Sequence, residues 1–517
     1  MPASAVLSLL VLLAQPQAAR PDAVRDTSPP DGSRPAEARK EDKKEEKEVP
    51  PVVTRHEMRA GGKLLKYTAT TGLMPLRTET GDLEANVFYV AYTLDRGAAP
   101  LEKRPLMFSF NGGPGSSSVW LHLGALGPKR VKMKDDGMMP PPPYALVDND
   151  DTWLTETDLV FIDPVGTGYS RAAKPELGKK FWGVEGDIAS VGEFIRLYLA
   201  RNERWASPLF LVGESYGTTR AAGLSGYLVE KGIAFNGIVL VSSILNFQTA
   251  RFTKGNDLPY PLFLPTYTAT AWYHKKLPAD LQAMPLGAVL AEVETFAKAE
   301  YPTQLAKGDA LTTAERKALA GRLARYTGLD PGWLDRADFR VEIQRFCKEL
   351  LRNERRIVGR LDTRFQGIDE SGVSERPEFD PSMTAIRPPY TAMFNQYVRS
   401  VLGYKSDATY HIMGGGIGPW DWGSHNGFAD TSESLRQAFA KNPDMKLFVA
   451  SGHFDLATPY FATQYTLAHL GLEPGQRARI TAKEYEAGHM MYIHTGEMAK
   501  LRKDVGTFLK DALPSAP

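Results

Sequence analysis

The chain has 517 residues, of which 43% are hydrophobic and 24% are charged, and its formal net charge is +1. This composition predicts a globular protein large enough for one big domain with an insertion, or for two or three domains. A net charge so close to zero, with no long basic stripe, argues against nucleic acid as a partner. Cys347 is the only cysteine, so no intramolecular disulfide can form.

The N-terminus carries a segment typical of export signals. Residues 5–14 are apolar (AVLSLLVLLA), and Ala18 and Ala19 supply small side chains for cleavage. The apolar run is too short to span a bilayer. We predict a signal peptide over residues 1–19 and an exported protein, periplasmic or secreted, without a membrane anchor. The sequence has no Asn-X-Ser/Thr acceptor, which favours a bacterial protein over a eukaryotic secretory one.

Residues 20–51 form a charged, proline-containing stretch with almost no aromatic or branched apolar side chains. Such a segment cannot bury enough surface to order itself, so we expect a disordered linker. A short charged helix is the alternative, and neither structure implies any chemistry.

From residue 52 onwards, strand-like and helix-like patterns alternate. Ile188, Val191, Ile195 and Leu199 recur at helical spacing. This alternation predicts an α/β fold with a mainly parallel sheet covered by helices on both faces. The strands are expected at 64–71, 86–94, 106–110, 159–163, 209–212, 238–241, 447–450 and 478–485.

The alternation stops near residue 247 and resumes near residue 445. Between them the pattern is mostly helical, with a capping box at Thr312–Glu315 and a helical run from Val341 to Leu351. We therefore expect a catalytic domain formed by residues 52–247 and 431–517, with a helical cap inserted at 248–430.

The most informative pattern is Gly213-Glu214-Ser215-Tyr216-Gly217, which follows an apolar strand and precedes a helix. A strand, then Gly-x-Ser-x-Gly, then a helix is the layout of a nucleophile elbow, which exposes a serine hydroxyl above the sheet. The flanking glycines fit because a side chain at either position would collide with neighbouring backbone at so sharp a bend.

A nucleophilic serine needs a base, and the base needs an acid that fixes its tautomer. In this architecture they follow in the order Ser, Asp or Glu, His. Asp455 and His489 fit that order, and each follows a predicted strand. An oxyanion hole is also required. Residues 111–116 (NGGPGS) form a glycine-rich loop after a strand, and the N–H of Tyr216 can supply a second donor.

Several stretches together resemble the serine carboxypeptidases, exopeptidases of the α/β-hydrolase fold: NGGPGSSS at 111–118, FIDPVGTGYS at 161–170, GESYG at 213–217, GHFDLATP at 452–459 and GHM at 488–490. The resemblance implies a serine-type carboxypeptidase that acts on peptides without a cofactor. It also implies roles for seven residues, namely the triad Ser215, Asp455 and His489, the oxyanion donors Gly113 and Tyr216, and the carboxylate-binding residues Asn111 and Glu214.

Three positions depart from the family pattern. Ser109 stands where the family usually has tryptophan, and Ser116 stands where it has a cysteine. Ala125 occupies the place of a second glutamate that often helps to bind the substrate's terminal carboxylate. Triad chemistry is untouched by these changes, but recognition of a free C-terminus is expected to be weaker.

The other candidate residues give weaker evidence of a functional role. No histidine spacing is typical of a metal site, so no metal is expected. His122 is expected to be a packed structural residue, although it could face the cleft, and Cys347 a buried inert thiol. Trp420 and Trp422 could line a substrate pocket or simply pack the cap. A serine esterase or acyltransferase on the same scaffold remains the alternative function, whereas a binding protein with a dead site is disfavoured because every catalytic position is filled.

Overall fold

The structure is a computed structural model that describes residues 48–97, 100 and 103–513. The predicted signal peptide and residues 20–47 of the predicted linker lie outside the described residues. The described residues form one compact unit that begins at Glu48.

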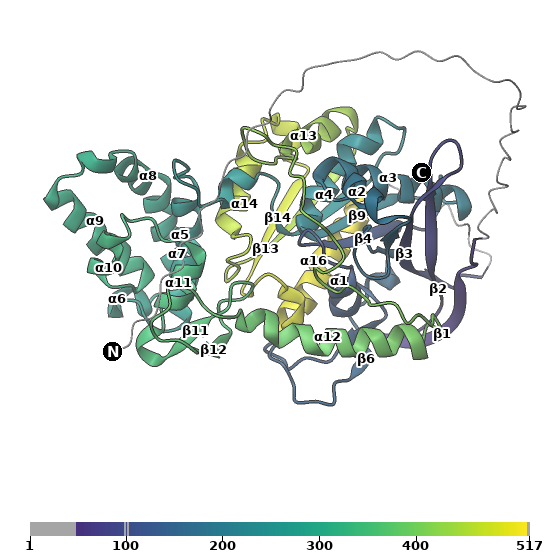
Figure 1. Ribbon diagram of the computed structural model, residues 1–517, viewed down its shortest axis with the longest axis horizontal. Coiled ribbons are helices and arrows are strands. Elements are labelled where there is room, and N and C mark those ends of the chain that lie inside the picture. The colour runs from purple at the N-terminus through teal and green to yellow at the C-terminus, as the bar shows by residue number, and fades with distance from the viewer. Residues whose placement is uncertain (1–47, 98–99, 101–102, 514–517) are drawn as a thin grey trace, which may run out of the picture. The chain divides into compact units, whose positions relative to one another are not determined.

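One large sheet organises this unit (Figure 1), and its strands run in the order β1-β2-β3-β7-β4-β9-β10-β13-β14, with β8 paired to β3. Strands β7, β4, β9, β10, β13 and β14 pair in parallel, whereas β1, β2 and β3 form an antiparallel extension that joins β7. The strands are β1 Val52–Ala60, β2 Lys63–Arg77, β3 Leu83–Leu94, β4 Leu106–Gly112, β5 Lys129–Val131, β6 Leu146–Asp148, β7 Asp158–Ile162, β8 Arg171–Ala172, β9 Leu209–Ser215, β10 Gly237–Ser243, β11 Arg356–Val358, β12 Gln366–Ile368, β13 Lys446–Gly452 and β14 Ile480–Tyr485.

Helices connect the parallel strands and fill the insertion between β10 and β13. They are α1 Val119–Leu121, α2 Gly178–Phe181, α3 Val184–Arg201, α4 Tyr216–Val229, α5 Pro259–Tyr273, α6 Ala279–Gln282, α7 Leu286–Lys298, α8 Glu300–Leu305, α9 Thr313–Thr327, α10 Pro331–Arg336, α11 Ile343–Glu349, α12 Pro381–Ser400, α13 Ser432–Lys441, α14 Tyr460–Ala468, α15 Pro474–Arg477 and α16 Thr495–Ala512.

The sheet separates two hydrophobic cores, because successive side chains of a strand point to opposite faces. In β9, Leu209 and Leu211 enter one core, whereas Phe210 and Val212 enter the other. Helices α3, α4 and α13 cover the first face, and α1, α12 and α16 cover the second. The fold is therefore an α/β-hydrolase fold with a mainly parallel sheet, as the sequence predicts.

The predicted insertion contains two differently packed parts. Helices α5–α11 share a core of their own, which continues onto α14 and the loop before it through Phe454, Leu456, Tyr460 and Phe461. Figure 1 shows these helices gathered together beside α14. Helix α12 instead buries Ile386, Tyr390 and Phe394 in the sheet's second core. The capping box at Thr312 and Glu315 is present at the start of α9.

Among the described residues, no helix combines the length and apolar character needed to cross a membrane.

Candidate active site

Ser215 stands at the junction between β9 and α4, with φ 59° and ψ −130°. A positive φ at a non-glycine residue is strained, and such strain is typical of a nucleophile elbow. Only glycine fits at the two positions that flank the elbow, because a side chain there would collide with backbone atoms. A Cβ added to Gly213 would lie 2.1 Å from the carbonyl oxygen of Gly217, and one added to Gly217 would lie 2.8 Å from that of Phe110.

His489 and Asp455 form a buried pair in which Nδ1 and Oδ2 are 2.7 Å apart. The Asp455 carboxylate is held in place by N–H groups of Ala457 and Thr458 and by the Thr458 hydroxyl, at 2.7 to 3.1 Å. Burial lowers the pKa of His489, but the charge and hydrogen bond of Asp455, together with the charge of Glu214, outweigh it, and the pKa is raised overall. The carboxylate thus fixes the ring and stabilises the imidazolium.

Two contacts connect the loop that carries His489 to the strand end that carries Ser215. Ser215 pairs with Ser243 across β9 and β10. The neighbouring Ser242 donates from its hydroxyl to the carbonyl oxygen of His489 over 2.6 Å. With Nδ1 engaged by Asp455, Nε2 is the ring nitrogen left to accept a proton from a nucleophile.

The glycine-rich loop 111–116 lies against the start of α4. A Cβ on Gly112 would be 2.1 Å from the backbone nitrogen of Gly217, so this approach tolerates only glycine. Tyr216, as the first residue of α4, has an N–H near the helix N-terminus, where N–H groups lack intrahelical acceptors. The loop is pinned by a segment of the insertion, through a bond from the Gly414 N–H to the carbonyl oxygen of Gly115 over 2.8 Å.

Glu214 and Asn111 lie buried beside the elbow, at 3% and 1% exposure. Oε2 of Glu214 accepts a 2.5 Å hydrogen bond from the phenol of Tyr492. Burial raises the pKa of Glu214 to about 7, although the charge of His489 and the hydrogen bond from Tyr492 oppose the rise. The amide of Asn111 lies near enough to lower the pKa of Glu214, yet its Nδ2 makes no hydrogen bond with proper geometry to any described residue.

Tyr492 is a site residue that the sequence analysis missed. It lies three residues after His489, and its ring packs so closely on Gly124 that a Cβ there would be 2.5 Å from Cε2. The hydroxyl of Tyr390 lies 2.7 Å from the same point. Gly124 and Ala125 belong to one buried π-helical turn, His122–Leu126. Two tyrosines therefore flank the turn that holds the alanine. The sequence pattern does not predict this arrangement, because it brings together residues from three separate segments of the chain.

The next two candidates, His122 and Cys347, are packed in the protein interior. His122 is buried, stacks on Phe161 with ring centroids 4.2 Å apart, and contacts the Tyr92 hydroxyl through Nε2 at 2.7 Å. Burial lowers its pKa to about 3, so it stays neutral. Cys347 is buried, and burial raises its pKa, which leaves the thiol protonated and inert.

Trp420 and Trp422 pack around Tyr216, the residue that follows the predicted nucleophile. Their rings lie 5.3 and 6.1 Å from that of Tyr216, edge-on in both cases. Phe247 completes this aromatic cluster, with its centroid 4.8 Å from that of Trp422. The pair thus packs against the elbow itself.

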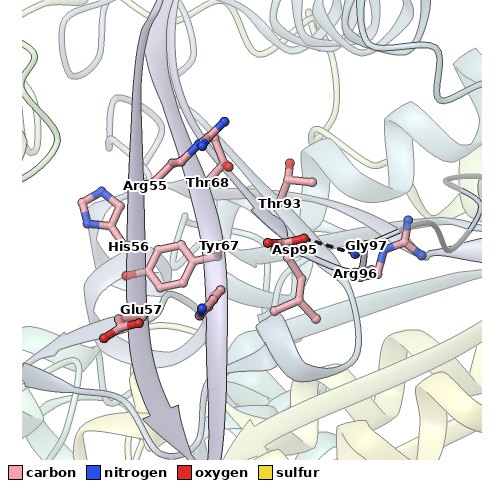
Figure 2. A pocket seen from close by; sticks show the side chains of 11 residues that line it. Arg55, His56, Glu57, Tyr67, Thr68, Thr93, Asp95, Arg96 and Gly97 are labelled. Atoms are coloured by element: carbon pink, nitrogen blue, oxygen red, sulfur yellow. Dashed lines mark hydrogen bonds between the residues drawn. The ribbon is translucent and has the colours of Figure 1, made fainter.

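Away from these residues, a polar pocket of about 980 Å³ lies on strands β1 to β3 (Figure 2). Its lining includes His56, Tyr67 and Asp95, and it shares no residue with the predicted site. Within the described ranges, no cluster of His, Cys, Asp and Glu could hold a metal ion.

The fold and the elbow define an α/β hydrolase, and comparison with known sequences gives the family. The serine carboxypeptidase family profile matches residues 63–276. The pheromone-processing carboxypeptidase KEX1 of Saccharomyces cerevisiae (strain JAY291) is 36% identical over 113 residues, which cover 21% of this chain and 14% of the yeast protein. The serine carboxypeptidase-like 50 protein of Arabidopsis thaliana is 27% identical over 166 residues, or 31% of this chain and 34% of that protein. Residues 63–276 therefore place this part of the chain with the serine carboxypeptidases.

The matches span about a seventh to a third of these two relatives. Among solved structures, a thermostable carboxyl esterase from Bacillus coagulans is similar at 12% identity with a TM-score of 0.36, covering 85% of this chain and 98% of the esterase.

Proposed function

We propose that the protein is a serine carboxypeptidase that releases C-terminal residues from peptides through an acyl-enzyme on Ser215. The observation that carries the proposal is the buried His489–Asp455 pair, with 2.7 Å between Nδ1 and Oδ2, held next to the strand end where Ser215 forms the elbow. The match to this family supports a peptide as the substrate.

In the proposed reaction, neutral His489 takes the proton of Ser215 as the hydroxyl oxygen attacks the scissile carbonyl carbon. The N–H groups of Gly113 and Tyr216 stabilise the oxyanion, and Asp455 stabilises the imidazolium. His489 then donates its proton to the departing amine, which leaves with the C-terminal residue. Water, activated by the same imidazole, hydrolyses the acyl-enzyme and regenerates Ser215.

Recognition of the free C-terminus is assigned to Glu214 and Asn111. A carboxyl with a pKa of about 7 is largely neutral in mildly acidic solution, so it can donate a hydrogen bond to a substrate carboxylate instead of repelling it. The Nδ2 of buried Asn111, which makes no hydrogen bond of proper geometry to a described residue, is a second donor.

The alternative is a serine esterase or acyltransferase on the same scaffold. Two observations favour it: the family's second glutamate is Ala125, and Glu214 is only 3% exposed. Both weaken selection for a free C-terminus without touching the triad.

Mass spectrometry of peptides incubated with the purified protein tests the proposal. A free-acid peptide, its C-terminal amide and a matched ester should be compared at pH 5 to 8. Stepwise loss of C-terminal residues, fastest from the free acid, supports the carboxypeptidase. Turnover of the ester without release of any residue from the peptide would support the alternative.

We also propose that the protein is exported, on the strength of the signal-like residues 1–19. N-terminal sequencing of the protein recovered outside the cytoplasm of a bacterial host tests this. An uncleaved Met1 in protein that remains with the cytoplasm would contradict it.

A further inference from the structure

Arg360 lies between the two loops that carry the histidine and the acid of the proposed triad. Its carbonyl oxygen accepts a hydrogen bond from the N–H of Leu456, the residue after Asp455, over 3.0 Å. The carbonyl oxygen of the next residue, Leu361, accepts one from the N–H of His489 over 2.7 Å. The positive charge of Arg360 also acts on the imidazole and lowers its pKa. This arginine of the insertion is therefore held on the histidine side of the site.

Arg251 lies beside the aromatic cluster that packs against Tyr216, the residue after Ser215. Its guanidinium carbon is 4.8 Å from the ring centroid of Trp422 and 5.3 Å from that of Phe247. Both rings belong to the cluster around Tyr216, which directly follows Ser215. The residue as a whole is exposed, and its guanidinium group lies over these two rings.

Neither guanidinium group has an anionic partner. Within the described part of the chain, the side chains of Arg251 and Arg360 make no hydrogen bond and no ion pair, and Arg251 has only its two ring contacts. Arg364, four residues further on, shows the ordinary arrangement, with two bonds of 2.9 and 2.7 Å to the carboxylate of Asp362.

The two unpaired charges also lie close enough to affect each other. Partial burial lowers the pKa of Arg251, and the positive charge of Arg360 lowers it further. Two like charges near a partly enclosed site are unfavourable when nothing neutralises them, and a carboxylate between them would relieve that repulsion. Guanidinium groups bind carboxylates through strong charge-assisted hydrogen bonds, often in a bidentate manner.

We propose that Arg251 and Arg360 form an anion subsite, beside Ser215 and His489, that binds a carboxylate of the peptide substrate. The proposal rests on the proposed peptidase function and names a part of the site that the family resemblance does not. The carboxylate has two possible sources, the C-terminus of the peptide and an acidic side chain next to the scissile bond. The chemistry is the same for both, so the substrates must separate them.

The experiment compares Arg251→Gln, Arg360→Gln and the double variant with Arg376→Gln as the matched control. Arg376 is an exposed arginine of the same insertion that pairs with Glu342 at 2.9 Å, so the control removes the same charge elsewhere. Three peptides are used: a free acid with a neutral last residue, its amide, and an amide whose last residue is glutamate. A matched ester without a carboxylate reports on the triad.

We expect the double variant to raise KM on the order of 10-fold or more for a carboxylate-bearing peptide, as for the loss of a hydrogen bond to a charged group. KM for the neutral amide and turnover of the ester should stay within about twofold of wild type. A rise confined to the free acid identifies the terminal carboxylate as the ligand, and one confined to the glutamate peptide identifies a side chain. Unchanged KM for both, or an equal loss on all substrates, would overturn the proposal.

Failure of the peptidase assignment can be told apart from failure of the subsite. If the wild-type protein cleaves no peptide, the proposed function fails. Calorimetry with Ser215→Ala and the free-acid and glutamate peptides then still measures binding. Binding that weakens when Arg251→Gln is added supports the subsite, and unchanged binding contradicts it. Arg251 is exposed, so this variant should fold even if Arg360→Gln does not.

Discussion

The phenol of Tyr492 donates a 2.5 Å hydrogen bond to Oε2 of Glu214, and both side chains are buried beside the proposed nucleophile. A protonated carboxyl has one O–H donor and keeps acceptor capacity, so Glu214 can accept from the phenol at Oε2 while its other oxygen carries the proton and donates to a substrate. This protein therefore places a tyrosine against Glu214, and the ring of Tyr492 packs on the turn where Ala125 stands in place of the family's second glutamate.

The first prediction concerns that phenol. Its hydrogen bond lowers the pKa of Glu214, so Tyr492→Phe should raise this pKa further. The rise of KM with pH for free-acid peptides should then begin at a higher pH, while ester turnover is unchanged. Tyr390→Phe is the control, because that buried tyrosine places its hydroxyl against the same glycine and, among the described residues, makes no hydrogen bond to Glu214. An unmoved KM profile in Tyr492→Phe would show that the bond does not set the titration.

The second prediction concerns Glu214 itself. Below its pKa of about 7 the carboxyl is neutral and can donate, and above it the carboxylate repels the substrate C-terminus. KM for free-acid peptides should therefore rise as pH increases through about 7, and Glu214→Gln should flatten that dependence.

Activity should also fall in acid, because His489 must be neutral to act as a base and its pKa is raised. The profile of kcat/KM is thus expected to be bell-shaped. Ester hydrolysis, which involves no terminal carboxylate, should hardly respond to Glu214→Gln. Equal losses on peptide and ester at every pH would indicate that Glu214 only braces the elbow.

The third prediction concerns the nucleophile. An organophosphonate fluoride should modify Ser215 and abolish turnover, and Ser215→Ala should lower kcat by about 10⁶, as for other triad serines. Peptide mapping of the labelled protein locates the adduct. Ser242, which donates to the carbonyl oxygen of His489, is the informative neighbour. A label on Ser242, or near-normal activity of Ser215→Ala, would rule the assignment out.

The fourth prediction concerns the acid. Asp455→Asn keeps the size of the side chain but disfavours the productive imidazole tautomer, so kcat should fall on the order of 10⁴. Asp430→Asn and Asp444→Asn are matched controls, because both residues lie in the same part of the chain and are exposed. Circular dichroism confirms that the variants fold. Sensitivity at a control position with none at Asp455 would reassign the third triad member.

The fifth prediction concerns the space around the elbow. A Cβ at position 213 would lie 2.1 Å from the carbonyl oxygen of Gly217, so Gly213→Ala should reduce the free energy of unfolding by about 1–3 kcal/mol. Gly321→Ala is the control, because nothing lies within 4 Å of the added carbon in helix α9. Chemical denaturation should show that variant unchanged, or more stable by up to about 1 kcal/mol. Equal stability of both variants would mean that the elbow relaxes easily.

Parts of the fold follow from local pattern, and parts do not. Ile188, Val191, Ile195 and Leu199 indicate a helix, and α3 covers them. Strand β1 was not predicted, because all its residues except Met58 and Ala60 are exposed or half-buried and it depends on pairing with β2. Helix α12 contains Pro388 and Pro389, which disfavour a helix interior. Its buried face on the sheet's second core overrides that preference.

The sequence by itself was enough to predict the chemistry of the candidate site. The signals are local features of the chain: the glycine spacing around Ser215, the strand ends before Asp455 and His489, and the loop after β4. Backbone sterics and strand order leave such features few possible arrangements. Only the tertiary structure decided what surrounds them. Tyr492 meets Glu214 across 278 positions, and Arg251 and Arg360 reach opposite sides of the site from separate parts of the insertion. These contacts depend on how the insertion and α12 pack on the sheet. Hydrophobic burial favours that packing, but it is non-directional, so the sequence pattern does not specify which distant segments come together.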